Sequence, residues 1–312
     1  MIYAGIDVGG TFLKGGLCDE KGEILYSGSV KTECSEEGLL EGVSDLLERL
    51  LREKGIRPAE LGGIGMGIPG MIDGTAGCIR YSNNLKIENF FIAEPLSKRF
   101  RLPVRITNDA NAAALGETRF GGGKGFRNVL LITLGTGVGG GVVLDGKIYE
   151  GNGGAGAELG HMVVVAGGEP CTCGRKGCLE AYASATALIR ETRRAMQSHP
   201  ESAMWRRVSD LSQVDGKTAF DCAGEDAAAR EVVERYLYYL GEGLLNFADI
   251  FRPEAILLGG GVSKQGKALT EPLQKKMDAE IFGGAGGPRV EIRVASLGNK
   301  AGLVGAAALF LD

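Results

Sequence analysis

The sequence predicts an α/β protein with two domains, and three observations carry that prediction. The chain has 312 residues, roughly twice the ~150 residues that typify one domain. Short apolar segments that suit buried strands alternate with longer segments in which apolar residues recur every three or four positions, as in amphipathic helices. Glycine contributes 52 residues, clustered beside the apolar segments, where backbone must turn tightly or approach a ligand closely.

The first elements follow directly from this patterning. A strand is expected over 2–8, then a glycine turn and further strands at 13–19 and 23–30. A helix is expected over 36–54, where leucine and valine recur at helical spacing between charged residues. The same reasoning predicts strands at 64–68, 104–107, 128–133, 141–144, 255–258 and 290–294, and helices at 110–120, 180–198, 225–250 and 302–311. Residues 199–222 are polar and are expected to be an irregular surface insertion.

Composition excludes several classes of protein. A hydrophobic fraction of 44% is enough to offset the entropy of ordering, so a disordered chain is excluded. A formal net charge of −4 argues against a protein that coats nucleic acid. The N-terminus reaches Asp7 without a basic region, unlike a signal peptide, and glycines interrupt the longest uncharged stretch, 128–144. Together with an odd number of cysteines, seven, these features predict a cytoplasmic protein that associates with neither nucleic acid nor membrane.

One pattern occurs twice. DVGGTFLKGGLCDEKGEI at 7–24 and LGTGVGGGVVLDGKIY at 134–149 each read as a strand end, a glycine-rich turn, a second strand, an Asp and Gly, and a third strand. Two copies of one hairpin suggest two similar domains whose turns offer backbone N–H groups to the same phosphate chain. The alternative is chance similarity between glycine-rich hairpins.

The first copy carries groups suited to phosphate and Mg²⁺. In DVGGTFLK, Gly9 and Gly10 allow close backbone approach, Thr11 offers a hydroxyl and Lys14 a cation. Asp7 could hold Mg²⁺ through water, because hard cations take oxygen ligands. The segment is not a Walker sequence, and an ordinary hairpin turn is the alternative interpretation.

Two later glycine clusters extend the phosphate hypothesis. LGTGVGGG at 134–141 offers the same kinds of group: Gly135 and Gly137 allow close backbone approach, and Thr136 offers a hydroxyl. LLGGGVS at 257–263 follows a buried strand and precedes a helix, so the N–H groups of Gly260 and Gly261 could meet a nucleotide. The G-x-G-x-x-G pattern lies between two strands rather than at the start of a helix, which argues against a dinucleotide site.

TNDANAAALGE at 107–117 places Asn108 and Asp109 where a strand ends and a helix begins. Asn and Asp are preferred helix caps, so capping is one interpretation. The other is a general base, held at the strand end, that accepts a proton from a substrate hydroxyl.

The segment GAELGH…CTCGRKGCLE supplies a metal-ligand set of one imidazole and three thiolates: His161, Cys171, Cys173 and Cys178. Such a set closes a tetrahedral zinc site and leaves no open position, so a structural role is expected. Glu158 and Glu180 flank it. They are either solvated or helix-end carboxylates, or acceptors for sugar hydroxyls through charge-assisted hydrogen bonds.

In these motifs the chain resembles the ROK family of sugar kinases over essentially its full length. CTCGRKGCLE matches the family pattern C-x-C-G-x-x-G-C-x-E at every fixed place, and DVGGTFLK, GIPGMID, TNDANAAALGE and GAELGH match in the family's order. The resemblance implies an actin-like (ribonuclease H-like) ATPase fold, with ATP and sugar in a cleft between two domains. It also implies a small domain of residues 1–108, joined by 301–312, a large domain of 109–300, and a homodimer.

The resemblance also implies roles for individual residues. Asp109 would be the base that deprotonates the sugar hydroxyl, and His161 would be both zinc ligand and sugar contact. Phe90 or Phe91 stands where the family usually has Trp, so the match around Asn84 is looser. The implied sugar contacts are Asn84, Asn108, Asp109, Glu158, His161 and Glu180. The implied ATP and Mg²⁺ contacts are Asp7, Gly9, Gly10, Thr11, Lys14, Gly135, Thr136, Gly137, Gly260 and Gly261.

The expected activity is ATP-dependent phosphorylation of a hexose, with glucose 6-phosphate as the first-choice product. N-acetylmannosamine and N-acetylglucosamine are alternative substrates, because loops outside the motifs read the acetyl group, and allose stays open. Fructose ranks lower, since Cys173 occupies the place of a second histidine in fructokinases of the family. Sugar-sensing repressors carry a DNA-binding domain ahead of this core, and the first strand expected at Ile2 leaves no room for one. A non-catalytic sugar-sensing regulator is the alternative of another class.

Overall fold

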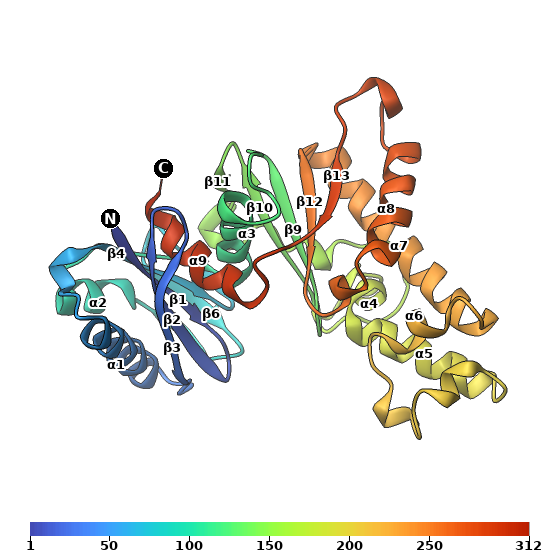
Figure 1. The fold of residues 1–312 in the computed structure, drawn as a ribbon, viewed down its shortest axis with the longest axis horizontal. Coiled ribbons are helices and arrows are strands. Elements are labelled where there is room, and N and C mark those ends of the chain that lie inside the picture. Colours follow the sequence, from blue (N-terminus) through green and yellow to red (C-terminus); the bar gives the residue numbers. More distant parts are fainter. Residues whose placement is uncertain (312) are drawn as a thin grey trace. The chain divides into compact units, whose positions relative to one another are not determined.

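The computed structural model describes residues 1–311, which fold as two compact units of alternating strands and helices (Figure 1). Unit 1 comprises Met1–Leu131, Gly141–Ala157 and Ser296–Asp312, and unit 2 comprises Ile132–Gly140 and Glu158–Ala295. The α/β class predicted from the sequence is confirmed. The predicted division into domains at residues 108 and 109 stays a prediction.

Unit 1 is built on a five-stranded sheet with the order β3-β2-β1-β4-β8. Strands β1 to β3 form an antiparallel meander, and β4 and β8 continue the sheet parallel to β1. The strands are β1 (Ile2–Val8), β2 (Phe12–Asp19), β3 (Ile24–Lys31), β4 (Leu61–Ile68) and β8 (Val104–Asn108).

Helices cover both faces of this sheet. A Cβ atom at Gly15 would meet Leu46 and Leu50 of α1 (Glu36–Lys54), whereas one at Gly16 would meet Leu303 of α9 (Ala301–Ala307). Successive strand residues face opposite sides, so α1 and α9 lie on opposite faces. Helix α1 ends where its leucine pattern predicts: Ser35 caps its N-terminus, and Gly55, at φ 72°, ends it in the left-handed conformation.

Helix α9 lies between the sheet and helix α3 (Asp109–Phe120), and glycine makes both contacts possible. On the sheet side, a Cβ atom at Gly65 would overlap the carbonyl oxygen of Ala306. On the α3 side, a Cβ atom at Gly305 would overlap the carbonyl oxygen of Ala112, and Gly116 faces the same crossing. Backbone therefore packs directly on backbone on both sides of α9.

Three short strands and one helix of unit 1 were not expected from the sequence. Strands β5 (Met71–Asp73), β6 (Cys78–Ser82) and β7 (Ile87–Phe90) form an antiparallel sheet, followed by helix α2 (Ala93–Phe100). Each strand has five residues or fewer, which is too short for a clear alternation of apolar and polar residues.

The second five-stranded sheet has the order β11-β10-β9-β12-β13, and the boundary between the units runs through β9 and β10. The elements are β9 (Val129–Leu134), β10 (Val138–Leu144), β11 (Lys147–Ile148), β12 (Ala255–Gly259), β13 (Glu291–Val294), α4 (Glu180–Ala183), α5 (Ala185–Ser198), α6 (Thr218–Cys222), α7 (Ala227–Phe251) and α8 (Lys267–Glu280). The repeated pattern of strand, glycine turn, strand and third strand is confirmed in β1–β3 and in β9–β11.

The expectation for residues 199–222 is wrong in part. This segment includes helix α6, and Met204, Val214 and Cys222 are buried. Its apolar residues are too widely spaced to show a helical period, although they still pack into unit 2. Across residues 1–311, the structure contains no helix whose length and apolar character would suit a membrane span.

The contact between α9 and the sheet predicts a large effect of Gly65→Ala. The added methyl group must displace the Ala306 backbone, so we expect the free energy of unfolding to fall by about 3 kcal/mol. Denaturant unfolding measures this change. Gly224→Ala is the matched control, because a Cβ atom there meets nothing within 4 Å and its φ is not left-handed. Equal stability of the two variants would contradict the close packing.

Candidate functional site

The predicted phosphate turn and the predicted base of unit 1 lie at one edge of its sheet. Strands β1, β4 and β8 are parallel, and their register pairs Asp7 with Gly67 and Gly67 with Thr107. The carboxyl ends of all three strands therefore meet at the same edge, the usual ligand-binding edge of a parallel sheet. The turn Gly9–Thr11 follows β1, and Asn108 and Asp109 end β8 and begin α3.

Asp7 and Lys14 form an ion pair across the β1–β2 hairpin, with Nζ 3.7 Å from Oδ2. Burial raises the pKa of the Asp7 carboxyl, and the positive charge of Lys14 partly opposes that shift. Helix α9 makes room for this carboxylate, since a Cβ atom at Gly302 would lie 2.9 Å from its Oδ1. The structure thus places a largely buried carboxylate and a cation directly beside the first glycine turn.

Asn108 is the N-cap of α3. Its Oδ1 accepts hydrogen bonds from the backbone N–H groups of Ala110 at 2.8 Å and Asn111 at 3.3 Å. Its Nδ2 donates to the carbonyl oxygen of Gly70 at 2.9 Å, and an amide nitrogen carries a second hydrogen that remains available for another acceptor. The capping interpretation is confirmed for Asn108. Asp109 follows this cap and lies in the first turn of α3, where the helix dipole favours a carboxylate.

Asn84 lies next to the first glycine turn. A Cβ atom at Gly10 would be 3.9 Å from the Cβ of Asn84. The Cys34 thiol lies 3.8 Å from the carbonyl oxygen of Gly10 and 3.7 Å from that of Asn84. The structure therefore brings the predicted substrate-loop asparagine and the predicted phosphate turn together within unit 1.

In unit 2, the turn Gly135–Gly137 is surrounded by the other predicted groups. The N–H of Val138, just after the turn, donates to Oε2 of Glu180 at 3.0 Å. Gly260, at φ 83°, packs on the Leu134 backbone, and a Cβ atom there would lie 2.5 Å from the Leu134 carbonyl oxygen. Only glycine suits this position, because both its φ and the close approach exclude a side chain.

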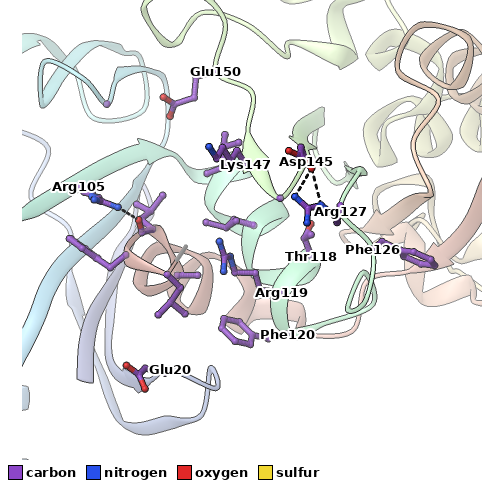
Figure 2. A pocket seen from close by; sticks show the side chains of 18 of the residues that line it. Glu20, Arg105, Thr118, Arg119, Phe120, Phe126, Arg127, Asp145, Lys147 and Glu150 are labelled. Carbon is purple, nitrogen blue, oxygen red and sulfur yellow. Dashed lines mark hydrogen bonds and ion pairs between the residues drawn. The ribbon is translucent and has the colours of Figure 1, made fainter. Parts of the chain in front are cut away.

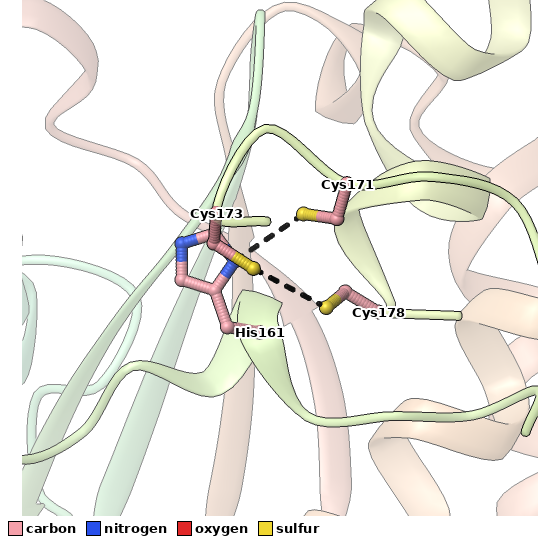
Figure 3. Close-up of side chains that lie close together, drawn as sticks. All are labelled: His161, Cys171, Cys173 and Cys178. Atoms are coloured by element: carbon pink, nitrogen blue, oxygen red, sulfur yellow. Dashed lines mark hydrogen bonds between the residues drawn. The ribbon is translucent and has the colours of Figure 1, made fainter. Parts of the chain in front are cut away.

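The four predicted metal ligands converge (Figure 3). Their ligand atoms all lie within 4.8 Å of one another. His161 Nδ1 is 3.6 Å from Cys171 Sγ, and Cys173 Sγ is 3.7 Å from Cys178 Sγ. A tetrahedral site with Zn–S bonds of ~2.3 Å has sulfur atoms about 3.8 Å apart, so the spacing of Cys173 and Cys178 suits this ion.

Two thiols of this cluster have pKa values that are shifted in opposite directions. Burial raises the pKa of Cys178 to about 12, whereas a hydrogen bond from the Arg175 backbone lowers the pKa of Cys173. A divalent cation bound here would supply the positive charge that keeps these thiolates ionised, including the buried Cys178.

Glu180 connects the cluster to the second glycine turn. Its Oε1 accepts from the Thr172 hydroxyl at 3.1 Å and lies 3.7 Å from Cys171 Sγ, while its Oε2 holds Val138. Glu158 is exposed and immediately precedes the short helix Leu159–His161 that carries the imidazole. Both flanking carboxylates of the sequence analysis therefore belong to the surroundings of the cluster in unit 2.

A cavity of about 1150 Å³ in unit 1 lies away from these residues (Figure 2). It is lined by the end of α3, the β10–β11 hairpin and the C-terminal turn Ala308–Phe310. Arg127 is paired with Asp145 there, and Arg105 lies 4.9 Å over the Phe310 ring. No predicted site residue lines this cavity within the part of the chain that the structure describes.

Sequence reasoning missed the role of Glu117. This carboxylate is fully buried and accepts hydrogen bonds from the backbone N–H groups of Gly122, Ser296 and Leu297 at 2.9, 3.0 and 2.6 Å. It therefore holds the segment that leads into α9. In the sequence, Glu117 only closes the TNDANAAALGE motif of the family resemblance, and a carboxylate near a helix end is usually solvated.

Comparisons with known proteins identify the family that the motifs resemble. The sequence model of the ROK family matches residues 3–312. The chain belongs to the ROK family. A glucokinase of Halalkalibacterium halodurans is 40% identical, over 97% of this chain and 93% of that protein. A glucokinase of Streptomyces coelicolor is 37% identical, over 98% of this chain and 96% of that protein.

A solved ROK structure extends this similarity to the fold. The ROK family glucokinase from Streptomyces griseus, in complex with glucose and AMPPNP, superposes with a TM-score of 0.79 at 35% identity and 99% coverage of both chains. The actin-like fold class expected from the motifs is thereby confirmed.

Proposed function

We propose that this ROK protein is an ATP-dependent sugar kinase that converts glucose to glucose 6-phosphate. The observation that carries the proposal is the full-length similarity to ROK glucokinases, one of them solved with glucose and an ATP analogue. The structure supports it in unit 1, where Asp109 and a glycine turn with an adjacent carboxylate share one sheet edge.

Phosphoryl transfer needs positioning and neutralisation of charge more than covalent help from the protein. In the proposal, Asp109 orients the attacking hydroxyl and accepts its proton, and its place at a helix N-terminus suits a carboxylate. Backbone N–H groups of the turns at Gly9–Thr11 and Gly135–Gly137 donate to phosphate oxygens, and Gly260 and Gly261 bind the adenosine side. Mg²⁺, when bound with ATP, neutralises phosphate charge, and Asp7 would hold it through water.

The proposed sugar contacts are polar groups on both units. In unit 1, Asn84 and Asn108 offer amides beside the turn and at the start of α3. In unit 2, Glu158, His161 and Glu180 offer a carboxylate, an imidazole and a second carboxylate. Carboxylates bind sugar hydroxyls well, because the hydrogen bond is assisted by their charge.

We further propose that His161, Cys171, Cys173 and Cys178 hold a structural Zn²⁺. When bound, the ion fixes the loop 161–178 and supplies no open coordination position. Through Thr172 and Cys171 the loop contacts Glu180, which in turn holds the second turn at Val138. The metal cluster would therefore support both a proposed sugar contact and a proposed phosphate turn. Dimerisation and a cytoplasmic location stay predictions.

The proposed activity predicts selective phosphorylation of one sugar. With ATP and Mg²⁺, a coupled assay should show glucose phosphorylated far faster than mannose, N-acetylglucosamine, N-acetylmannosamine, fructose or allose. A faster reaction with an N-acetylated sugar would keep the kinase and reassign its substrate. No turnover of any sugar by folded, zinc-replete protein would overturn the kinase proposal and favour a sugar-sensing regulator.

The proposed base predicts that Asp109→Asn lowers kcat by at least about 100-fold, because the amide cannot accept the hydroxyl proton. Its melting temperature should stay close to that of the wild type, since an amide of the same shape remains at the start of α3. Glu36→Gln is the matched control: it removes an exposed carboxylate from the first turn of α1 and should leave kcat unchanged. Wild-type turnover by Asp109→Asn would remove Asp109 from this role.

The proposed zinc site predicts one Zn²⁺ per chain by elemental analysis. Cys178→Ser should lose most of this metal and melt at a lower temperature, and a strong chelator should lower the melting temperature of the wild type in the same way. Cys222→Ser is the matched control, because that thiol is equally buried in unit 2 but lies outside the cluster. Full metal content in Cys178→Ser would contradict the assigned ligand set.

A further inference from the structure

Two carbonyl oxygens of the first glycine turn accept hydrogen bonds from one residue outside the turn, Thr32. The hydroxyl of Thr32 donates to the carbonyl oxygen of Gly9 at 2.6 Å, and the Thr32 backbone N–H donates to that of Thr11 at 2.9 Å. Thr32 directly follows β3 and is only 7% exposed. Its side chain is therefore fixed by its surroundings, and it fixes the turn.

Because a peptide group is planar, the hydrogen bond to the Gly9 carbonyl also sets the direction of the next N–H group. In a trans peptide, the C=O group and the N–H group of the following residue point in opposite directions. Because Thr32 holds the Gly9 carbonyl, the Gly10 N–H faces away from Thr32. Among the residues that the structure describes, no protein acceptor takes the N–H of Gly10 or Thr11. Both groups are thus available as donors.

Unit 2 contains a related arrangement, in which two consecutive residues of α5 bind the first two carbonyl oxygens of the turn. The hydroxyl of Thr186, in the first turn of α5, donates to the carbonyl oxygen of Thr136 at 2.8 Å. The neighbouring Ala185 N–H donates to that of Gly135, also at 2.8 Å. By the same geometry, the N–H groups of Thr136 and Gly137 face away from α5, and neither has a protein acceptor within residues 1–311.

We propose that Thr32 and Thr186 are positioning residues for phosphoryl transfer. Neither touches a phosphate in this proposal. Each hydroxyl binds a turn carbonyl and so presents the next N–H, that of Gly10 or Gly137, to phosphate oxygens. The inference rests on the proposed kinase function and adds to it two residues outside every motif of the family resemblance. Donors held in place before the reaction stabilise developing charge without the cost of reorientation.

Valine has nearly the shape of threonine and lacks the hydroxyl, whereas serine retains it. We expect Thr32→Val and Thr186→Val each to lower kcat/KM for ATP about tenfold or more, because an unrestrained turn peptide no longer presents its N–H group. Thr32→Ser and Thr186→Ser should stay within about threefold of the wild type. The affinity for glucose, measured by calorimetry without nucleotide, should be unchanged in all four variants.

Matched controls separate this role from a general loss of stability. Thr118 in α3 and Thr192 in α5 are buried threonines whose hydroxyls donate to helix carbonyls at 2.7 and 2.8 Å, away from either turn. Thr118→Val and Thr192→Val should change the melting temperature as much as the test variants do and leave kcat/KM for ATP unchanged. Wild-type kcat/KM in the test valine variants, or an equal loss in the serine variants, would overturn the proposal.

A second readout separates this inference from the proposed function. Binding of a non-hydrolysable ATP analogue with Mg²⁺ is measured by calorimetry without any sugar. We expect Thr32→Val and Thr186→Val to weaken this binding, and the serine variants to restore it. If the wild type binds the analogue but phosphorylates no sugar, the kinase proposal fails and the analogue titrations still decide the role of the threonines. Equal binding by valine variants and wild type would refute that role.

Discussion

Unit 1 depends on the direct packing of helix α9 against backbone on two sides. Glycines at 65 and 305 let this helix approach the sheet and α3 more closely than any side chain would allow. Helix α9 also leaves space for the Asp7 carboxylate at Gly302, and at Gly305 it contacts α3, the helix that begins at Asp109. Buried Glu117 secures the approach to α9 by binding the N–H groups of Ser296 and Leu297. The Asp7 carboxylate and the helix that begins at Asp109 therefore both lie against one small-residue helix.

In the proposed function, the two glycine turns must meet the same electrostatic requirement. A turn that is to bind an anion must keep its carbonyl oxygens, which carry partial negative charge, away from the ligand while leaving its N–H groups unpaired. In the first turn Thr32 takes up the carbonyl oxygens, and in the second Ala185 and Thr186 do so. Glu180 adds a constraint found only in unit 2, because its carboxylate holds Val138 with one oxygen and the cysteine loop with the other. The order of that loop and the order of the turn are therefore linked.

Much of this arrangement was predictable from the sequence, because it depends on local pattern. The leucine spacing of α1, the repeated hairpins and the cysteine-rich segment all appear as predicted, as does the convergence of His161 with the three cysteines. The strands β5 to β7 were missed because they are short, and α8 because Pro272 interrupts its pattern. The roles of Glu117, Thr32 and Thr186 were not predictable, since each depends on partners brought together by tertiary packing. Nothing in a single threonine reveals which carbonyl oxygen its hydroxyl will meet.

The separation of Thr32 and Thr186 from their partners bears on the order of folding. Thr32 and Gly9 are 23 residues apart within one antiparallel meander, so the first turn can be completed by the N-terminal hairpins alone. Thr186 and Thr136 are 50 residues apart, and the cysteine-rich loop lies between them. Closing that longer loop costs more chain entropy, and contacts of long sequence separation form late. A chain emerging from the ribosome can thus complete the first turn early, whereas the second must wait until α5 has docked.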